Sequence, residues 1–415
     1  MLAFTFPGQG SQQPGMGRPW VDHPSWALVE HASTASGRDV AALLLDADAD
    51  ELRRTENAQL ATYVLSLVVH DAVHALGLRC HRAAGHSLGE YTALTATGAL
   101  SLDDGVRLVT ERGAAMQAAA DARPGTMAAV LGADDDVVAD ACARASGDVW
   151  VANTNGAGQV VIAGDADAIS EAGAIAKELG ARKVMPLPVG GAFHTPFMEP
   201  AAERLRAALR ATTFADASVP VVANVDALPH QHADQWADLL GAQLTAQVRW
   251  RQTIDRMVAD GITTFLELGP GAVLTGVAKR QAPEGTAVAA ATPDSLDAVV
   301  EAARQVGAVE MRARSVAPAA RHRRTTPEPA PMPLHDHHDG EHLSAPERLV
   351  VSPAAGVFTP VDDIAEGHEI EPGHVLGHVA GHEVRSAFRG TVKGLLAVAG
   401  ERLTHRQPVA WLRTA

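Results

Sequence analysis

The feature that most constrains the fold is a serine with a glycine two residues away on each side, in Gly85-His86-Ser87-Leu88-Gly89. The run follows Ala83-Ala84, which is typical of the end of a buried strand, and a helix pattern begins at about Leu88. Glycines at these two positions relieve the crowding of a tight strand-to-helix turn, and such a turn projects the serine hydroxyl outward. The sequence therefore predicts a strand-turn-helix unit with Ser87 as a nucleophile.

Alternating strand and helix patterns extend over residues 1–312 and predict an α/β core with a largely parallel sheet. Long helices are expected at Ala58–Leu76 and Asp103–Ala120. Short apolar runs predict strands at Ala3–Phe6, Met127–Leu131, Val160–Ala163, Val184–Leu187, Val219–Asn224 and Thr264–Leu268. Residues 124–190 have the order β–α–β–β–α–β, so we expect an inserted ferredoxin-like subdomain there.

The composition changes after residue 312. Residues 313–345 hold five prolines and a histidine-rich run, and this composition predicts a semi-extended linker. The histidines could hold a metal loosely, but nothing nearby would fix a ligand geometry, so a solvated linker is the favoured interpretation.

Residues 346–415 carry an internal duplication. The pattern Val350-x-Ser352-x-x-x-Gly356 recurs as Val384-x-Ser386-x-x-x-Gly390. Each half alternates apolar and polar residues and breaks at glycine, which predicts strands and turns. We expect the two halves to interlock into a small all-β barrel or sandwich domain.

Charge and cysteine content exclude several classes of protein. The chain has 34 basic and 49 acidic residues, and its net charge of −15 disfavours binding to nucleic acid or to an anionic membrane. Cys80 and Cys142 lie in apolar stretches and cannot form a disulfide framework or a four-sulfur zinc site. The longest uncharged apolar run, Leu60–Val69, is too short to span a bilayer, and no signal-peptide pattern opens the chain. We expect a cytoplasmic protein.

A serine nucleophile requires a general base, and His194 is the predicted one. It lies in Gly190-Gly191-Ala192-Phe193-His194, a glycine-rich loop after a strand, where binding residues concentrate. His86 adjoins the serine, but successive side chains on a tight turn diverge, so His86 is the poorer base.

A second glycine turn, Pro7-Gly8-Gln9-Gly10, ends the first expected strand. It is too short for a phosphate-binding loop and has no lysine. In a parallel sheet its tip lies at the same edge as the serine turn. The backbone N–H groups of Gln9 and Leu88 are therefore the predicted donors to a developing oxyanion.

Six motifs occur in order and carry a resemblance to a known family. They are Phe6-Pro7-Gly8-Gln9-Gly10-Ser11, Gly85-His86-Ser87-Leu88-Gly89-Glu90-Tyr91, Val106-Arg107-Leu108-Val109-x-x-Arg112-Gly113, Gly158-Gln159-Val160-Val161-Ile162-Ala163-Gly164, Gly191-Ala192-Phe193-His194 and Glu267-Leu268-Gly269-Pro270-Gly271. Over about residues 1–300 the chain closely resembles the malonyl-CoA:acyl carrier protein transacylases and the acyltransferase domains of polyketide synthases. The resemblance implies an α/β-hydrolase-like core.

The resemblance also implies a ping-pong reaction and a set of residue roles. Ser87 would take a malonyl group from malonyl-CoA with His194 as general base, and the thiol of an acyl carrier protein would then accept it. A backbone carbonyl orients the histidine in this family, and the matching position is Gln243. Arg112 matches the arginine that binds the free malonyl carboxylate, a task that suits a planar guanidinium. Phe193 matches the malonyl-selecting form of its motif, where a ring would crowd a 2-methyl branch.

The tail resembles the biotinyl/lipoyl-domain superfamily in its duplicated halves and in Gly390-Thr391-Val392. Those domains carry a modifiable lysine at the hairpin between the halves, whereas residues 377–384 contain none and Lys393 is the only lysine of the tail. The departure implies that no biotin or lipoate is attached and that the module serves docking or assembly with a protein partner. Metal binding by His368, His374, His378 and His382 is a weaker alternative.

Three functions are compatible with these residues. The leading hypothesis is a malonyl transferase of fatty acid, polyketide or another malonyl pathway, with malonyl-CoA and an acyl carrier protein as partners and with no cofactor or metal. A thioester hydrolase using the same serine and a non-catalytic scaffold are the alternatives. A carrier protein of this family is acidic, so docking would need a local basic patch, for which Arg182-Lys183 and Lys279-Arg280 are the candidates.

Overall fold

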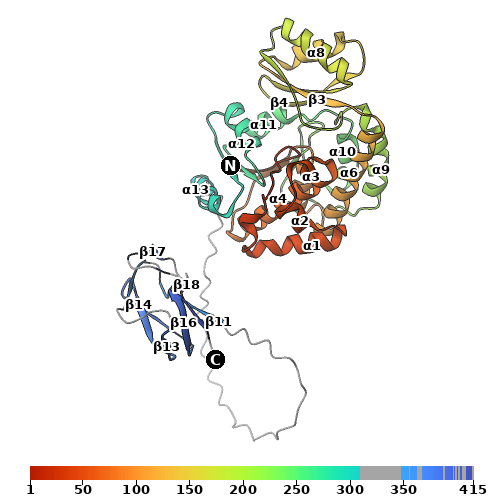
Figure 1. Cartoon of the computed structure of the whole chain (residues 1–415). Coiled ribbons are helices and arrows are strands. Elements are labelled where there is room, and N and C mark those ends of the chain that lie inside the picture. The colour runs from red at the N-terminus through yellow and green to blue at the C-terminus, as the bar shows by residue number, and fades with distance from the viewer. Residues whose placement is uncertain are drawn as a thin grey trace, which may run out of the picture. The chain divides into compact units, whose positions relative to one another are not determined.

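The computed structural model describes residues 1–308 and, nearer the C-terminus, 347–413 without 355, 362–366, 387, 396, 398–399, 401 and 404–407. The chain divides into two compact units, residues 1–317 and 318–415, each described here by itself (Figure 1). The predicted linker 313–345 lies outside the described residues. Within the described ranges, no helix combines the length and the apolar character needed to cross a membrane.

A six-stranded sheet forms the centre of the first unit, in the order β10-β9-β1-β2-β7-β8. Its strands are β1 (Leu2–Phe6), β2 (Arg82–Gly85), β7 (Val221–Val222), β8 (Pro229–His230), β9 (Thr264–Leu268) and β10 (Thr286–Ala290). Every pair is parallel except β7 with β8, so the expected largely parallel sheet is present. Because Phe6 lies opposite Gly85, the turns that follow β1 and β2 leave the sheet at the same edge.

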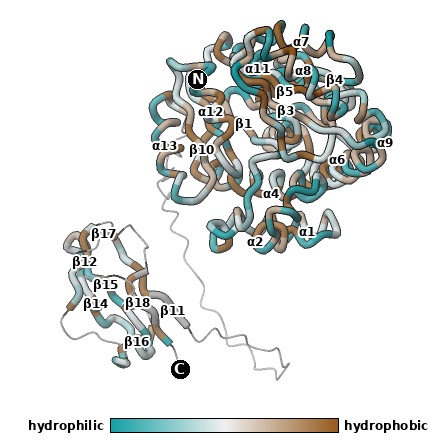
Figure 2. Tube along the Cα trace, turned by 45° about the horizontal axis from the view of Figure 1, so that its top comes forward, coloured by the Kyte–Doolittle hydropathy of each residue, from teal (hydrophilic) through white to brown (hydrophobic). Residues whose placement is uncertain are grey.

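Helices surround this sheet, some in contact with its strands and others packed on neighbouring helices. They are α1 (Ala27–Ser36), α2 (Val40–Leu45), α3 (Ala49–Arg53), α4 (Thr55–Ala75), α5 (Gly89–Ala96), α6 (Leu102–Ala122), α9 (Glu199–Arg210), α10 (Trp236–Gln243), α11 (Trp250–Ala259), α12 (Val273–Gln281) and α13 (Leu296–Gln305). Helix α4 is buried along most of its length, and its buried positions include the polar side chains of Asn57, Gln59 and Ser66. The surface helices carry a mixture of hydrophobic and hydrophilic residues along their length (Figure 2).

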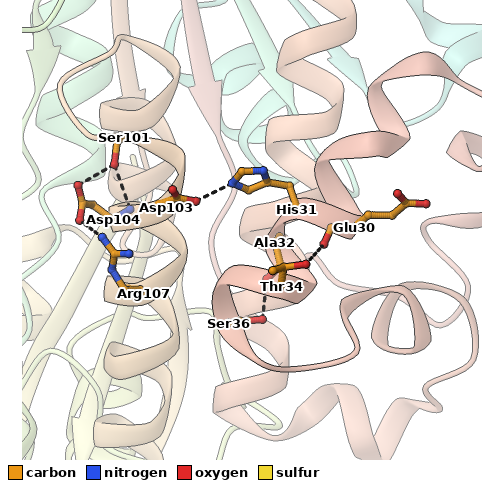
Figure 3. A network of polar contacts seen from close by, with 9 residues as sticks. All are labelled: Glu30, His31, Ala32, Thr34, Ser36, Ser101, Asp103, Asp104 and Arg107. Carbon is orange, nitrogen blue, oxygen red and sulfur yellow. Dashed lines mark hydrogen bonds and ion pairs between the residues drawn. The ribbon is translucent and has the colours of Figure 1, made fainter.

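A polar network on the surface fixes the first turn of α6 beside α1 (Figure 3). Ser101 caps the helix by accepting a 3.1 Å hydrogen bond from the Asp104 N–H. His31 of α1 pairs with Asp103 of α6 at 2.6 Å. Asp104 also pairs with Arg107 one turn further along. These contacts set the start of the helix that carries Arg112.

Residues 126–186 form a subdomain at one end of the first unit, labelled by β3, β4 and α8 in Figure 1. Its elements are β3 (Thr126–Leu131), α7 (Asp135–Arg144), β4 (Val149–Gly156), β5 (Gln159–Gly164), α8 (Ala166–Glu178) and β6 (Lys183–Pro186). They follow the order predicted for 124–190, and the strands pair antiparallel in the order β4-β5-β3-β6. The subdomain has a hydrophobic cluster of its own, which includes Cys142.

The second unit is built from two four-stranded antiparallel sheets. Its strands are β11 (Glu347–Val351), β12 (Gly356–Pro360), β13 (Glu369–Ile370), β14 (Val375–Val379), β15 (His382–Arg385), β16 (Gly390–Leu395), β17 (Arg402–Leu403) and β18 (Pro408–Arg413). One sheet has the order β11-β18-β16-β13 and the other β15-β14-β12-β17. Phe358, Leu376, Val392 and Leu412 are among the residues of the core.

The sequence duplication accounts for this arrangement. Strands β11 to β14 come from the first half and β15 to β18 from the second, and the strand order of one sheet becomes that of the other when corresponding strands are exchanged. Each sheet therefore contains strands of both halves, so the halves interlock. The duplicated serines are both buried, and each donates a 2.7 Å hydrogen bond to a carbonyl two residues ahead: Ser352 to Ala354 and Ser386 to Phe388.

Candidate active site

The backbone of Ser87 is strained at the turn between β2 and α5. Its φ is 52°, in the left-handed region that non-glycine residues rarely adopt. A Cβ on Gly85 would lie 1.8 Å from the Gly89 carbonyl oxygen, and one on Gly89 would lie 2.1 Å from that of Phe6. Both glycines of the serine motif are therefore required by close backbone contacts. Strain of this kind costs about 1–3 kcal/mol and concentrates at functional sites.

Ser87, His194 and Gln243 form a continuous hydrogen-bonded chain. Ser87 Oγ lies 2.7 Å from His194 Nε2, and His194 Nδ1 lies 2.9 Å from the backbone oxygen of Gln243, the last residue of α10. Because a carbonyl oxygen can only accept, Nδ1 carries the proton and Nε2 accepts the serine proton. The structure thus places the predicted nucleophile, base and orienting carbonyl in mutual contact.

The environment of His194 keeps its imidazole neutral. The residue is 5% exposed and has a φ of 61°, a second strained backbone at the site. Burial and then the nearby charge of Arg112 lower the pKa of His194 to about 3. A neutral imidazole is the form that can accept a serine proton, so His194 has at neutral pH the protonation state that the predicted role requires.

Arg112 is a buried cation next to the nucleophile. It projects from α6, is 1% exposed and donates a 3.0 Å hydrogen bond to Ser87 Oγ. It also donates to the side-chain oxygens of Gln59 at 2.6 Å and Gln243 at 3.0 Å. The guanidinium lies 5.4 Å from the centre of the Tyr91 ring. Among the described residues, nothing accepts a hydrogen bond from its Nε, which leaves one donor of a buried cation unused.

A second layer of polar side chains holds these groups, and it was not predicted from the sequence. The Asn224 side chain accepts from the Ser87 N–H at 2.7 Å and donates to the Gly85 carbonyl at 2.8 Å. Glu90 is 1% exposed and accepts a 2.5 Å hydrogen bond from Gln243 Nε2. Gln59 donates to the sulfur of Met116 at 3.1 Å. Because these residues come from separate elements, no local motif reports their association.

The expected strand Val219–Asn224 is wrong in length. Only Val221–Val222 pairs with β2, and Asn224 leaves the sheet. The physical reason is the bonding of the Asn224 side chain to both ends of the serine turn, which requires the chain to turn toward Ser87 at that point.

The two predicted oxyanion donors lie on adjoining turns. A Cβ on Gly8 would lie 2.4 Å from the backbone oxygen of His86, so the Gln9 turn contacts the serine turn directly. Within the described part of the chain, no atom accepts a hydrogen bond from the backbone N–H of Gln9 or of Leu88. The Ser87 N–H, by contrast, is already bonded to Asn224. Two unused N–H groups beside the nucleophile match the requirement for an oxyanion site.

A cleft of about 440 Å³ adjoins the serine turn, with the Gln9 turn, β4, β5 and the start of α12 among its walls. His86, Asn153 and Asn155 belong to its lining, whereas Ser87, His194 and Arg112 do not. The His86 ring points away from Ser87, because its Nε2 lies 2.8 Å from Asn155 Oδ1 and its ring contacts Trp250. His86 therefore lines the cleft, and its Nε2 bonds to Asn155 and not to Ser87.

Phe193 does not belong to the lining of this cleft. Its ring is 5% exposed and packs in the main hydrophobic core, next to Gly191. Its predicted role in substrate selection stays a prediction.

Within the described ranges, no group of three or more histidine, cysteine, aspartate or glutamate side chains is arranged to hold a metal ion.

Comparisons with known proteins agree with this geometry. Residues 3–308 match the family described as "Acyl transferase domain". The malonyl CoA-acyl carrier protein transacylase of Bacillus subtilis is 38% identical over 309 residues, which is 73% of this chain and 98% of that protein. The protein of the same name from Escherichia coli strain K12 is 40% identical, over 72% of this chain and 99% of its own length.

Two solved structures are similar over the same part of the chain. The malonyl-CoA:acyl carrier protein transacylase of Xanthomonas oryzae is 42% identical with a TM-score of 0.70, and the match covers 72% of this chain and 98% of that one. A malonyl-transacylase solved in complex with a type II polyketide synthase acyl-carrier protein is 35% identical with a TM-score of 0.70, covering 72% of this chain and 99% of that one.

Proposed function

The chain belongs to the acyl transferase family, and from that premise we propose how its residues transfer a malonyl group. The overall reaction moves malonyl from malonyl-CoA to the thiol of an acyl carrier protein, for fatty acid or polyketide synthesis. The single observation that carries the residue assignment is the hydrogen-bonded chain from Ser87 Oγ through His194 to the Gln243 carbonyl.

In the first half-reaction, Ser87 Oγ attacks the thioester carbonyl carbon while its proton moves to His194 Nε2. The carbonyl oxygen becomes an oxyanion, which the N–H groups of Gln9 and Leu88 stabilise. The carbon–sulfur bond then breaks, and CoA leaves as a thiol after taking the proton from His194. The Gln243 carbonyl accepts from Nδ1 throughout and keeps the imidazole in the reactive orientation.

In the second half-reaction the phosphopantetheine thiol of the carrier protein gives its proton to His194 and attacks the malonyl ester. The carbon–oxygen bond to Ser87 breaks, and Ser87 Oγ regains a proton from His194. This sequence balances without a metal or a prosthetic group, and we propose that the enzyme uses none.

Arg112 supplies recognition of the malonyl carboxylate. In malonyl-CoA this carboxylate is two bonds from the reacting carbon, and the guanidinium lies 3.0 Å from the nucleophilic oxygen. A paired guanidinium stabilises a buried carboxylate that would otherwise lose several kcal/mol of hydration. We propose further that Phe193 limits the space for a 2-methyl branch by shaping the loop that carries His194, an effect of about 1–3 kcal/mol.

The two basic pairs, Arg182-Lys183 and Lys279-Arg280, are the proposed docking site of the acidic carrier protein. Arg280 donates a 2.9 Å hydrogen bond to Gln159, which lines the cleft. Arg182 packs on Gly132, whose N–H bonds the Gly158 carbonyl at 2.8 Å. Both pairs thus flank the β4–β5 turn at the cleft. Charge reversal at Arg280 should raise KM for the carrier and leave acylation by malonyl-CoA unchanged.

We propose that the second unit is a biotinyl/lipoyl-like barrel-sandwich that carries no prosthetic group and binds a protein partner. The interlocked halves support the fold assignment. Ala380 and Gly381 occupy the turn between β14 and β15, where a carrier domain would hold its lysine, and Lys393 lies within strand β16. Intact mass of the protein expressed with a biotin ligase tests this: an added biotinyl group would contradict the proposal.

Intact mass spectrometry with malonyl-CoA tests the catalytic assignment. The wild type should gain one malonyl group, and Ser87→Ala should gain none. Subsequent addition of holo carrier protein should move the malonyl group to the carrier faster than water removes it. Rapid loss to water without carrier would favour the hydrolase instead, and labelling of Ser87→Ala would contradict the assignment of the nucleophile.

A further inference from the structure

Arg112 is a buried cation without a carboxylate in direct contact. Its hydrogen bonds go to two amide oxygens and to Ser87 Oγ. No aspartate or glutamate among the described residues forms an ion pair with it. An isolated buried charge is costly, so a compensating charge is expected close by.

Glu90 is the carboxylate that reaches Arg112 indirectly. It lies in the first turn of α5 and is 1% exposed. The amide of Gln243 bridges the two charges: its Nε2 donates to Glu90 Oε2 at 2.5 Å, and its Oε1 accepts from Arg112 at 3.0 Å. An amide can bridge in only this orientation, because its nitrogen donates and its oxygen accepts. Burial raises the pKa of Glu90 and lowers that of Arg112, and the charge of each residue opposes the shift of the other.

We propose that Glu90 is the counter-charge of Arg112 in the free enzyme, acting through the Gln243 side chain, and that it limits how strongly the site prefers a carboxylated acyl group. The inference rests on the proposed role of Arg112 in malonyl recognition. Glu90 is a positioning residue here, since it touches neither substrate nor reacting atoms.

Two carboxylates, that of Glu90 and that of the malonyl group, compete for the guanidinium of Arg112. When the malonyl carboxylate binds Arg112, it meets a charge that Glu90 already partly compensates. Removal of the Glu90 charge would leave Arg112 with only the substrate as its partner and would favour malonyl. An acetyl group has no carboxylate, so its transfer would not gain.

Glu90→Gln is the variant that isolates this charge, because glutamine keeps an oxygen that can accept from Gln243 Nε2. Burial raises the pKa of Glu90 to about 7, with Asp226 raising it and Arg112 lowering it. Assays at about pH 8.5 therefore keep the wild-type carboxyl ionised. The readout is the rate of Ser87 acylation by malonyl-CoA and by acetyl-CoA, followed by rapid-quench mass spectrometry.

We expect Glu90→Gln to raise the malonyl-to-acetyl ratio of kcat/KM by about three- to tenfold. In an Arg112→Ala background the same substitution should leave the ratio unchanged. A purely structural role would slow both acyl groups by the same factor, and an unchanged or lowered ratio would overturn the inference.

Two further measurements keep the test decisive. If Glu90→Gln does not fold, the wild type supplies the test: lowering the pH from about 8.5 to about 6 protonates the Glu90 carboxyl, whose pKa is about 7, and should raise the ratio in the wild type but not in Arg112→Ala. Glu267→Gln is the matched control: Glu267 is also 1% exposed, but it accepts from the N–H groups of Leu274 and Thr275 at the start of α12. The malonyl-to-acetyl ratio of kcat/KM for Glu267→Gln should equal that of the wild type.

The same experiment separates this inference from the proposed function. Absence of a malonyl adduct on Ser87 in the wild type would contradict the transferase mechanism itself. A wild type that is malonylated normally, with a Glu90→Gln ratio that does not rise, would contradict only the role of Glu90.

Discussion

Buried polar groups serve different purposes in the two units of this chain. In the first unit, Ser87, His194, Arg112 and Gln243 bond to one another although they come from separate elements. In the second unit, the buried hydroxyls of Ser352 and Ser386 each bond to a carbonyl two residues ahead.

The two units differ in the hydrogen-bond donors that folding leaves without acceptors. The local bonds of the second unit close its turns and give each hydroxyl an acceptor. Within residues 1–308, three donors at the centre of the network of the first unit have no acceptor. They are Arg112 Nε and the backbone N–H groups of Gln9 and Leu88. Donors without acceptors that cluster beside a strained serine indicate a site prepared for a substrate.

Arg112→Ala gives the largest effect and tests whether the tertiary network serves recognition. We expect malonyl transfer to fall about 100-fold or more, while acetyl transfer is spared or raised, because only malonyl loses a charged partner. The measurement is kcat/KM for malonyl-CoA and acetyl-CoA. Equal losses for both would remove the distinction between a recognition network and a structural one.

The pH dependence of acylation sharpens the comparison at the level of one residue. With an ordinary histidine pKa of 6.5, kcat/KM would fall about tenfold between pH 7.5 and pH 5.5. Because burial and Arg112 lower the pKa of His194 to about 3, the imidazole stays neutral over this range. We therefore expect acylation by acetyl-CoA, which does not depend on the Glu90 charge, to change by less than about twofold. A tenfold loss over this range would show that the buried network does not control the base.

Ser352→Ala tests the second unit. Loss of the buried hydroxyl should destabilise that unit by about 1–2 kcal/mol, and Ser386→Ala should have a similar effect because its bond is equivalent. Thermal unfolding of the full chain measures this, with malonylation of Ser87 as the control. A change in the malonylation rate would show that the second unit contributes to the site.

The smallest effect is expected from Asp103→Asn at the start of α6. Its pair with His31 is exposed on both sides, with 54% and 52% of the side chains accessible, so we expect a loss of about 0.5 kcal/mol or less in stability. Malonyl transfer should not change. A larger loss would mean that the surface network of Figure 3 positions α6, and with it Arg112, more strongly than its exposure suggests.

Local sequence patterns predicted the parts of this protein that depend on neighbouring residues. The spacing of Gly85, Ser87 and Gly89 specified the strained turn, because only glycine tolerates the backbone contacts found there. The order of elements in 124–190 followed from hydrophobic periodicity, and the duplication predicted interlocking halves. His194 was predicted as the base from its glycine-rich loop, whereas Arg112 and the Gln243 carbonyl became recognisable as site residues only through resemblance to a family.

Tertiary structure alone decided which distant side chains complete the site. Gln59, Glu90, Asn224 and the Gln243 side chain belong to α4, α5, the segment after β7 and α10, and each is unremarkable in its own stretch of sequence. Glu90 lies in the first turn of a helix, where acidic residues are common because they interact favourably with the helix dipole, whether or not they have a catalytic role. Hydrogen bonds between separate elements depend on three-dimensional packing, which a local pattern does not encode, so the counter-charge of Arg112 emerged only once the chain was folded.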